Sequence, residues 1–162
     1  MSNIEKRIEY HSNGQKKLEG TYKNSRKHGL VTVWHENGQK VIEGTWKDGE
    51  QNGLWTWWNE NGLKAFETTY KDGWEDGLRT SWHENGQKEI ETTYKDGKPI
   101  DGLYTERHEN GRKRMEGTHK NGKKDGLWTY WHENGKKENE EIYKNGYRDG
   151  LCTSWHENGQ KE

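Results

Sequence analysis

Cysteine, proline and long apolar runs are almost absent from this 162-residue sequence. It holds 1 Cys, 1 Pro and 25% hydrophobic residues, against roughly 45–50% apolar residues in an ordinary domain. The lone Cys152 excludes an intramolecular disulfide and a cysteine-based metal site. No run of about 18 apolar residues suits a signal peptide or a transmembrane helix. We expect no thick aliphatic core, no membrane insertion, and a cytoplasmic location unless an export signal precedes this sequence.

An excess of charge of one sign is lacking as well. The 27 Lys and Arg balance 28 Asp and Glu, for a net charge of −1, which argues against nucleic acid as a partner. What the chain has is 21 Gly, 10 Trp and 8 Tyr. Disordered chains are poor in aromatic residues. The composition therefore predicts a folded, thin sheet whose few buried positions hold large rings.

Asn-Gly pairs recur through the whole chain at an almost fixed interval. They lie at 13–14, 37–38, 61–62, 85–86, 110–111, 134–135 and 158–159, separated by 24, 24, 24, 25, 24 and 24 residues. A fixed period of this length is typical of a repeat architecture. Residues 1–162 are predicted to form a single repeat domain of about six hairpin repeats plus a terminal strand, each stabilised by its neighbours.

Alternation with a period of two predicts two strands in each repeat, and no segment has a helical period. A three-residue Glu-Asn-Gly turn, with glycine in a left-handed bulge, would pair Trp34 with Lys40. One buried face would then carry Leu30, Thr32, Trp34, Ile42, Gly44 and Trp46. Glu43 and its equivalents would lie on an opposite, solvated face.

A longer loop, such as 47–53, is expected to join one repeat to the next, and the single one-residue insertion, near Pro99, falls in such a loop. The predicted fold is all-β: an elongated, single-layer antiparallel β-meander, or solenoid, of tandem hairpins of about 24 residues.

Two segments carry a family resemblance. Glu43-Gly44-Thr45-Trp46-Lys47-Asp48-Gly49 with Gly53-Leu54-Trp55, and Glu116-Gly117-Thr118-His119-Lys120-Asn121-Gly122 with Gly126-Leu127-Trp128, resemble the bacterial MORN-variant repeat of the MORN_2 type. That repeat is found in proteins labelled YwqK-like antitoxins. The resemblance implies an elongated sheet of MORN repeats used for scaffolding or protein binding, and the antitoxin label points to no site.

Histidine is the sharpest candidate for chemistry, because it recurs beside the turns at 11, 35, 83, 108, 132 and 156. Equivalent strands of successive repeats lie about 9.6 Å apart, whereas a zinc–nitrogen bond measures about 2.0–2.1 Å. Neighbouring histidines therefore cannot share one ion without distortion. Catalysis needs a unique set of residues, which repetition does not single out. We expect exposed turn histidines, no metal, no cofactor and no enzymatic activity.

Aromatic residues on the expected outer face suggest a binding surface. Trp55, Trp57, Trp128 and Tyr130 occupy that face, with Trp74 in a nearby loop. Exposed Trp and Tyr serve partner hot spots or sugar-stacking platforms, although they also cover neighbouring strands as cross-strand pairs. We predict a non-catalytic scaffold that binds an unidentified protein along its sheet. The alternatives are an immunity- or antitoxin-type inhibitor of a toxin and a glycan-binding module.

The last strand, with Leu151, Thr153 and Trp155, is expected at an open edge. Unpaired backbone groups at such an edge favour end-to-end self-association. The alternatives are that the sheet continues into residues beyond this sequence, or that the short segment 160–162 shields the edge.

Overall fold

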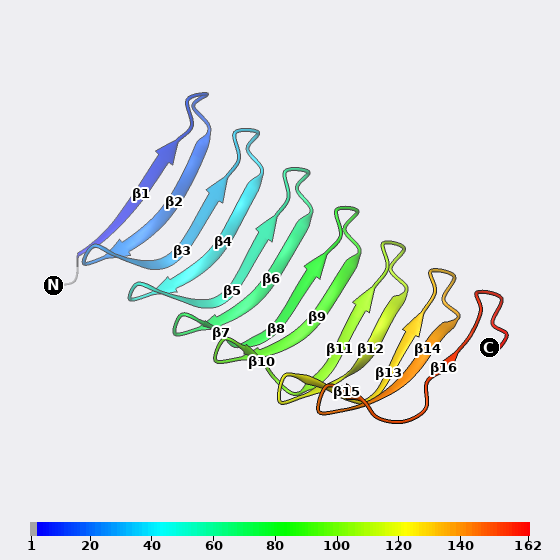
Figure 1. Ribbon diagram of the computed structural model, residues 1–162. Helices are drawn as coiled ribbons and strands as arrows, with labels where there is room; N and C mark the ends of the chain where they lie inside the picture. The colour runs from blue at the N-terminus through cyan, green and yellow to red at the C-terminus, as the bar shows by residue number, and fades with distance from the viewer. Residues whose placement is uncertain (1–2) are drawn as a thin grey trace. The chain divides into compact units, whose positions relative to one another are not determined.

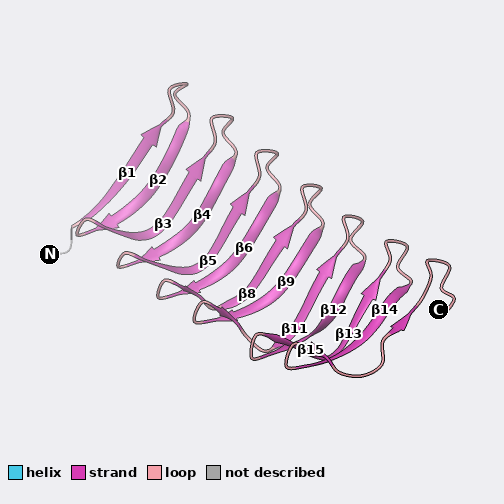
Figure 2. Cartoon of the chain, in the orientation of Figure 1, coloured by secondary structure: helices cyan, strands magenta, loops and turns pink. Residues whose placement is uncertain are grey.

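The computed structural model describes residues 3–162, and its elements are all β-strands joined by turns (Figures 1 and 2). The chain divides into two compact units, Met1–Gly77 and Leu78–Glu162. Within each unit, successive long strands pair antiparallel in a single layer. The prediction of an all-β antiparallel meander of hairpin repeats is confirmed. None of the residues described forms a helix long and apolar enough to cross a membrane.

The first unit contains six long strands in chain order and one short strand. They are β1 (Ile4–Tyr10), β2 (Lys16–Lys23), β3 (Arg26–Trp34), β4 (Lys40–Lys47), β5 (Glu50–Trp58) and β6 (Lys64–Lys71), with β7 (Trp74–Glu75) pairing β6. The second unit contains β8 (Gly77–Trp82), β9 (Lys88–Lys95), β10 (Lys98–Pro99), β11 (Gly102–Arg107), β12 (Lys113–Lys120), β13 (Lys123–Trp131), β14 (Lys137–Lys144), β15 (Tyr147–Arg148) and β16 (Thr153–Ser154). There, β10 pairs β9, while β15 and β16 pair β14.

The Asn-Gly turn has the bulged form predicted. In the β3–β4 turn, the Gly38 N–H donates to the His35 carbonyl at 2.9 Å, and the His35 N–H donates to the Gln39 carbonyl at 2.8 Å. Gly38 has φ 82°, a conformation that glycine adopts without a steric cost. Trp34 pairs with Lys40, as the sequence predicted.

A second bulge directly after this turn reverses the predicted faces. Val33 pairs with Ile42 rather than Val41, so Val41 is an extra residue on β4. One extra residue changes which side chains share a face. Val31 and Val33 therefore share a face with Ile42, Gly44 and Trp46, and the prediction that Leu30, Thr32 and Trp34 share that face is wrong.

The two faces of the sheet are named here by what they carry. The aromatic face carries Val31, Val33, Ile42, Trp46, Trp55, Trp57, Phe66 and Tyr70 in the first unit, and Tyr104, Met115, His119, Trp128, Tyr130 and Tyr143 in the second. The threonine face carries Leu30, Thr32, Glu43, Leu54, Thr56 and Glu67 in the first unit, and Leu103, Thr105, Glu116, Leu127, Thr129 and Glu140 in the second.

The predicted seven-residue loop between repeats is wrong, because the strands continue to a two-residue turn. Asp48 (φ 52°) and Gly49 (φ 96°) alone join β4 to β5, as in the type I′ turns of tight hairpins. Lys47 pairs with Glu50 immediately beyond them. A bulge containing Gly53 (φ 79°) then interrupts the pairing before Trp55 meets Gly44. Each repeat thus has an additional bulge where a loop was expected.

Candidate interaction surfaces

Trp55 is buried at the centre of the aromatic face in the first unit, with 3% of its surface exposed. Its indole lies against Gly44, where an added Cβ would be only 2.1 Å from the ring. The indole N–H donates to the Thr45 carbonyl at 3.1 Å, beside the bulge. Trp46 and Tyr70 contact the ring edge-on, with centroids 5.3 and 6.1 Å away, a favourable aromatic geometry. Trp55 therefore stabilises the sheet.

Trp128 repeats this arrangement in the second unit and is fully buried. It lies on Gly117, and its indole N–H donates to the Thr118 carbonyl at 3.2 Å. His119 contacts the ring edge-on at 4.9 Å, and the Lys124 ammonium lies 4.2 Å from its centroid. The expectation that Trp55 and Trp128 are exposed is wrong, because the second bulge places both on the packed face.

The other aromatic candidates differ in exposure. Trp57 is half-buried against Phe66, with ring centroids 4.6 Å apart. Tyr130 is also half-buried, and its hydroxyl accepts a hydrogen bond from the Lys124 ammonium at 2.7 Å. Trp74 begins β7 and is 65% exposed. Of the five predicted binding residues, Trp74 is thus the one whose ring is open to a partner.

A buried carboxylate and several half-buried polar groups lie beside the aromatic cluster of the second unit. Glu141 is only 5% exposed, and its carboxylate accepts a hydrogen bond from the Tyr143 hydroxyl at 2.6 Å and pairs with the Arg148 guanidinium at 2.5 Å. The Tyr104 hydroxyl donates to Glu106 at 3.1 Å. The charge of Glu141 is therefore compensated within this unit, as a buried carboxylate requires.

The burial of Tyr104 predicts a loss of stability at alkaline pH. Burial first, and then the charge of Glu106, raises the pKa of the Tyr104 phenol from 10.0 to about 12. A raised folded-state pKa stabilises the fold below the unfolded pKa, and this contribution is lost as the pH rises through the folded pKa. The free energy of unfolding should therefore fall between pH 10 and about 12, and fall less in Tyr104→Phe. Urea unfolding across this range tests it; equal declines would contradict it.

On the threonine face, glutamates form a repeated network with threonine and lysine. The Thr32 hydroxyl donates to Glu43 at 3.1 Å, and the Lys40 ammonium pairs with the same carboxylate at 2.6 Å while lying over the Trp58 ring. The same arrangement recurs at Thr56, Glu67 and Lys64, and at Thr105, Glu116 and Lys113. The prediction that these glutamates are simply solvated is wrong, because each accepts hydrogen bonds from buried threonines.

A leucine on the threonine face is exposed in each repeat, and we call these residues the leucine stripe. In the first unit it comprises Leu30 and Leu54, which are 54% and 55% exposed. In the second unit it comprises Leu78, Leu103, Leu127 and Leu151, with the exposed Ile142 opposite Leu127. Sequence reasoning placed this column in the core. Its signal was a leucine directly after the bulge glycine in every repeat.

Four of the turn histidines link one turn to the next within each unit. The His11 ring Nε2 lies 2.8 Å from the Trp34 carbonyl, and in the second unit His83, His108 and His132 contact the carbonyls of Arg107, Trp131 and Trp155. Asn13 also donates to the Glu36 carbonyl at 2.8 Å. These four histidines are half-buried, so the expectation that they are exposed is wrong. Across residues 3–162, no three His, Cys, Asp or Glu side chains gather as metal ligands would.

The segment 160–162 folds back on the last strand. Lys161 pairs with Trp155, the Glu162 N–H donates to the Ser154 carbonyl at 2.9 Å, and the His156 N–H donates to the Gln160 carbonyl at 2.9 Å. The structure therefore has the shielded form of this edge at Ser154–His156. Leu151 precedes the shielded part and is 85% exposed. End-to-end self-association stays a prediction.

Single-layer hairpins, linked turn to turn by side chains, define a class of β-repeat proteins. The MORN repeat variant matches residues 6–24, 27–48, 51–72, 75–96 and 124–145, and the chain belongs to this family. The longer unmatched stretches are 97–123, which contains the extra residue near Pro99, and 146–162. A search of curated proteins found no match.

Proposed function

We propose that this protein is a non-catalytic scaffold that binds a partner protein along its threonine face through the leucine stripe. MORN repeats are generally interaction modules, which supports a scaffold. The leucine stripe carries the proposal, because single exposed leucines are ordinary whereas an apolar row repeated along one face is typical of an interaction surface. In the first unit Leu30 and Leu54 lie opposite Thr45 and Thr69, whose small side chains leave the leucines prominent.

The aromatic face supports the proposal less well. Trp55 and Trp128 are buried, so a partner would have to open the sheet to reach them. Their burial also removes two of the rings that a glycan platform would need. Trp74, at 65% exposure, is the aromatic residue we assign to partner contact at the margin of the first unit.

Substitution of the stripe tests this function. In Leu54→Asp combined with Leu127→Asp, a charge replaces an apolar contact in each unit, so partner binding should fall more than about tenfold. Leu63→Asp is the matched control, because Leu63 is 42% exposed but lies in an Asn-Gly turn. Retention of source-cell proteins on the immobilised variants measures binding, and circular dichroism verifies folding. Undiminished retention by the folded double variant would refute the proposal.

An immunity- or antitoxin-type role is a narrower form of the same proposal. It comes from the resemblance to YwqK-like antitoxins, and it predicts that the partner is a toxin. A toxin gene beside the gene for this protein would identify the partner to test first. Inhibition of that toxin by the protein, and its loss in the Leu54 and Leu127 variant, would support this role.

A further inference from the structure

We infer that the leucine stripe of the second unit takes an acidic segment of the partner protein, held by lysines at the two-residue turns. This inference rests on the proposed function and adds the charge of the partner. It starts from the cross-strand pairs at these turns. Lys120 lies directly opposite Lys123, and Lys95 lies directly opposite Lys98.

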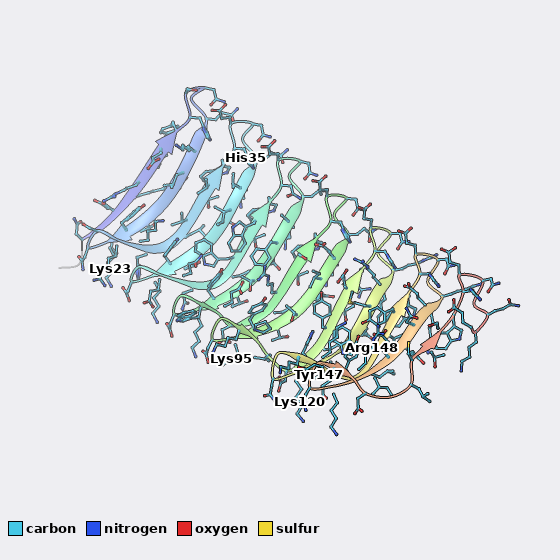
Figure 3. All side chains as sticks on the ribbon, viewed as in Figure 1. Lys23, His35, Lys95, Lys120, Tyr147 and Arg148 are labelled. Atoms are coloured by element: carbon cyan, nitrogen blue, oxygen red, sulfur yellow. The ribbon has the colours of Figure 1, made fainter. Side chains whose placement is uncertain are left out.

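Like charges in directly opposite positions destabilise a sheet. Lys120 and Lys123 carry the inference, and the side chains of both are exposed. The Lys123 stem lies beside the next turn, 3.3 Å from where a Gly146 Cβ would be. In Figure 3, Lys95 and Lys120 extend from the edge where these turns lie. An anionic partner would relieve the repulsion between Lys120 and Lys123.

The lysines at these turns, such as Lys120 and Lys144, border the leucine stripe. Lys120 lies two residues beyond Thr118, and Thr118 pairs with Leu103. Lys144 lies two residues beyond Ile142, which pairs with Leu127. Because alternate residues of a strand point to the same face, lysine, leucine and isoleucine all lie on the threonine face. A segment with both acidic and apolar side chains matches this order.

The opposite border of the stripe favours a protein segment over an anionic membrane. Glu116 and Glu140 follow the leucines toward the Asn-Gly turns, and each pairs with a lysine of its own strand. Asp125 lies opposite Thr118, within the basic margin. A flat anionic bilayer would meet these carboxylates together with the lysines. A narrow chain can lie on the leucines and reach Lys120 and Lys123 without contacting Glu116 or Glu140.

The test uses the full chain and two synthetic probes. The first is a fluorescent peptide rich in Leu and Glu, and the second has every Glu replaced by Lys. Fluorescence anisotropy should show binding of the acidic peptide, weakened by added salt, and at least about tenfold weaker binding of the basic one. Lys120→Glu with Lys123→Glu should weaken the acidic peptide more than about tenfold and improve the basic one. Lys17→Glu, at an exposed lysine of β2 in the first unit, should change neither.

A carbodiimide, which couples ammonium groups directly to carboxylates, should join Lys120 or Lys123 to the acidic peptide. Leu103→Ser with Leu127→Ser should also weaken that peptide. If only the leucine variant weakens binding, the proposed function stands and the acidic inference fails. If neither variant weakens it, both fail. The inference would be overturned if the acidic peptide did not bind. It would also be overturned if the protein bound only phosphatidylserine vesicles, through Lys120 and Lys123.

Discussion

Trp128→Ala is expected to lower the free energy of unfolding by about 3–5 kcal/mol, the usual cost of removing a buried tryptophan. The ring is fully buried, and it fills the space above Gly117 that no side chain of that residue occupies. Its loss also removes the hydrogen bond to the Thr118 carbonyl and the surface on which Lys124 lies. The cavity and the lost partners act together.

Urea unfolding followed by circular dichroism measures this effect, and Trp74→Ala is the control. Trp74 is 65% exposed, so its replacement should alter stability by no more than about 0.5 kcal/mol, as for most surface sites. Equal effects of the two substitutions would contradict the assignment of Trp128 to the core. Trp128 would then again be a candidate for partner contact.

Gly44→Ala is expected to destabilise the first unit by about 1–3 kcal/mol through overpacking. An added Cβ would lie 2.1 Å from a ring atom of Trp55, and rings cannot yield as a flexible chain end does. In a Trp55→Val background the cost should largely vanish. The chain itself holds this smaller pair, since Gly20 lies opposite Val31.

A double-mutant cycle isolates the coupling between Gly44 and Trp55. Gly20→Ala is the matched single control, because its Cβ would lie 3.1 Å from a Val31 methyl group and the contact needs only a small adjustment. The effects of Gly44→Ala and Trp55→Val should be far from additive. Strict additivity would mean that the glycine is needed for its backbone rather than for the ring.

The turns were predictable from sequence because their chemistry is local. Asn37 and Gly38 determine a bulged turn, since the Asn37 side-chain oxygen accepts from the Gln39 N–H and Gly38 adopts a left-handed conformation. The faces were not predictable in the same way. The additional bulge at Val41 has no glycine or other turn residue to mark it, yet it exchanges the contents of the two faces.

The predicted binding surface was wrong for the same reason. Trp55 was assigned to the exterior and Leu54 to the interior, and the structure has the reverse. The column of Gly20, Gly44 and Gly117 was the available signal, because a strand glycine often marks the close approach of a neighbouring group. The hydrogen bond from His11 to the Trp34 carbonyl could not be predicted from the sequence, since it depends on how one turn lies beside the next.

The bulge at Gly53 also identifies where the chain can change length. From Asn52, opposite Thr45, to Thr56, opposite Glu43, the strand advances four residues. In the repeat that carries the insertion, the Ile100 N–H donates to the Thr93 carbonyl and Thr105 pairs with Glu91. Between these two points the strand advances five residues instead of four. Both versions deliver the next threonine to the same face. Short peptide tags or epitopes inserted here should leave the orientation of every downstream side chain intact, which makes this interruption the natural grafting position of the repeat.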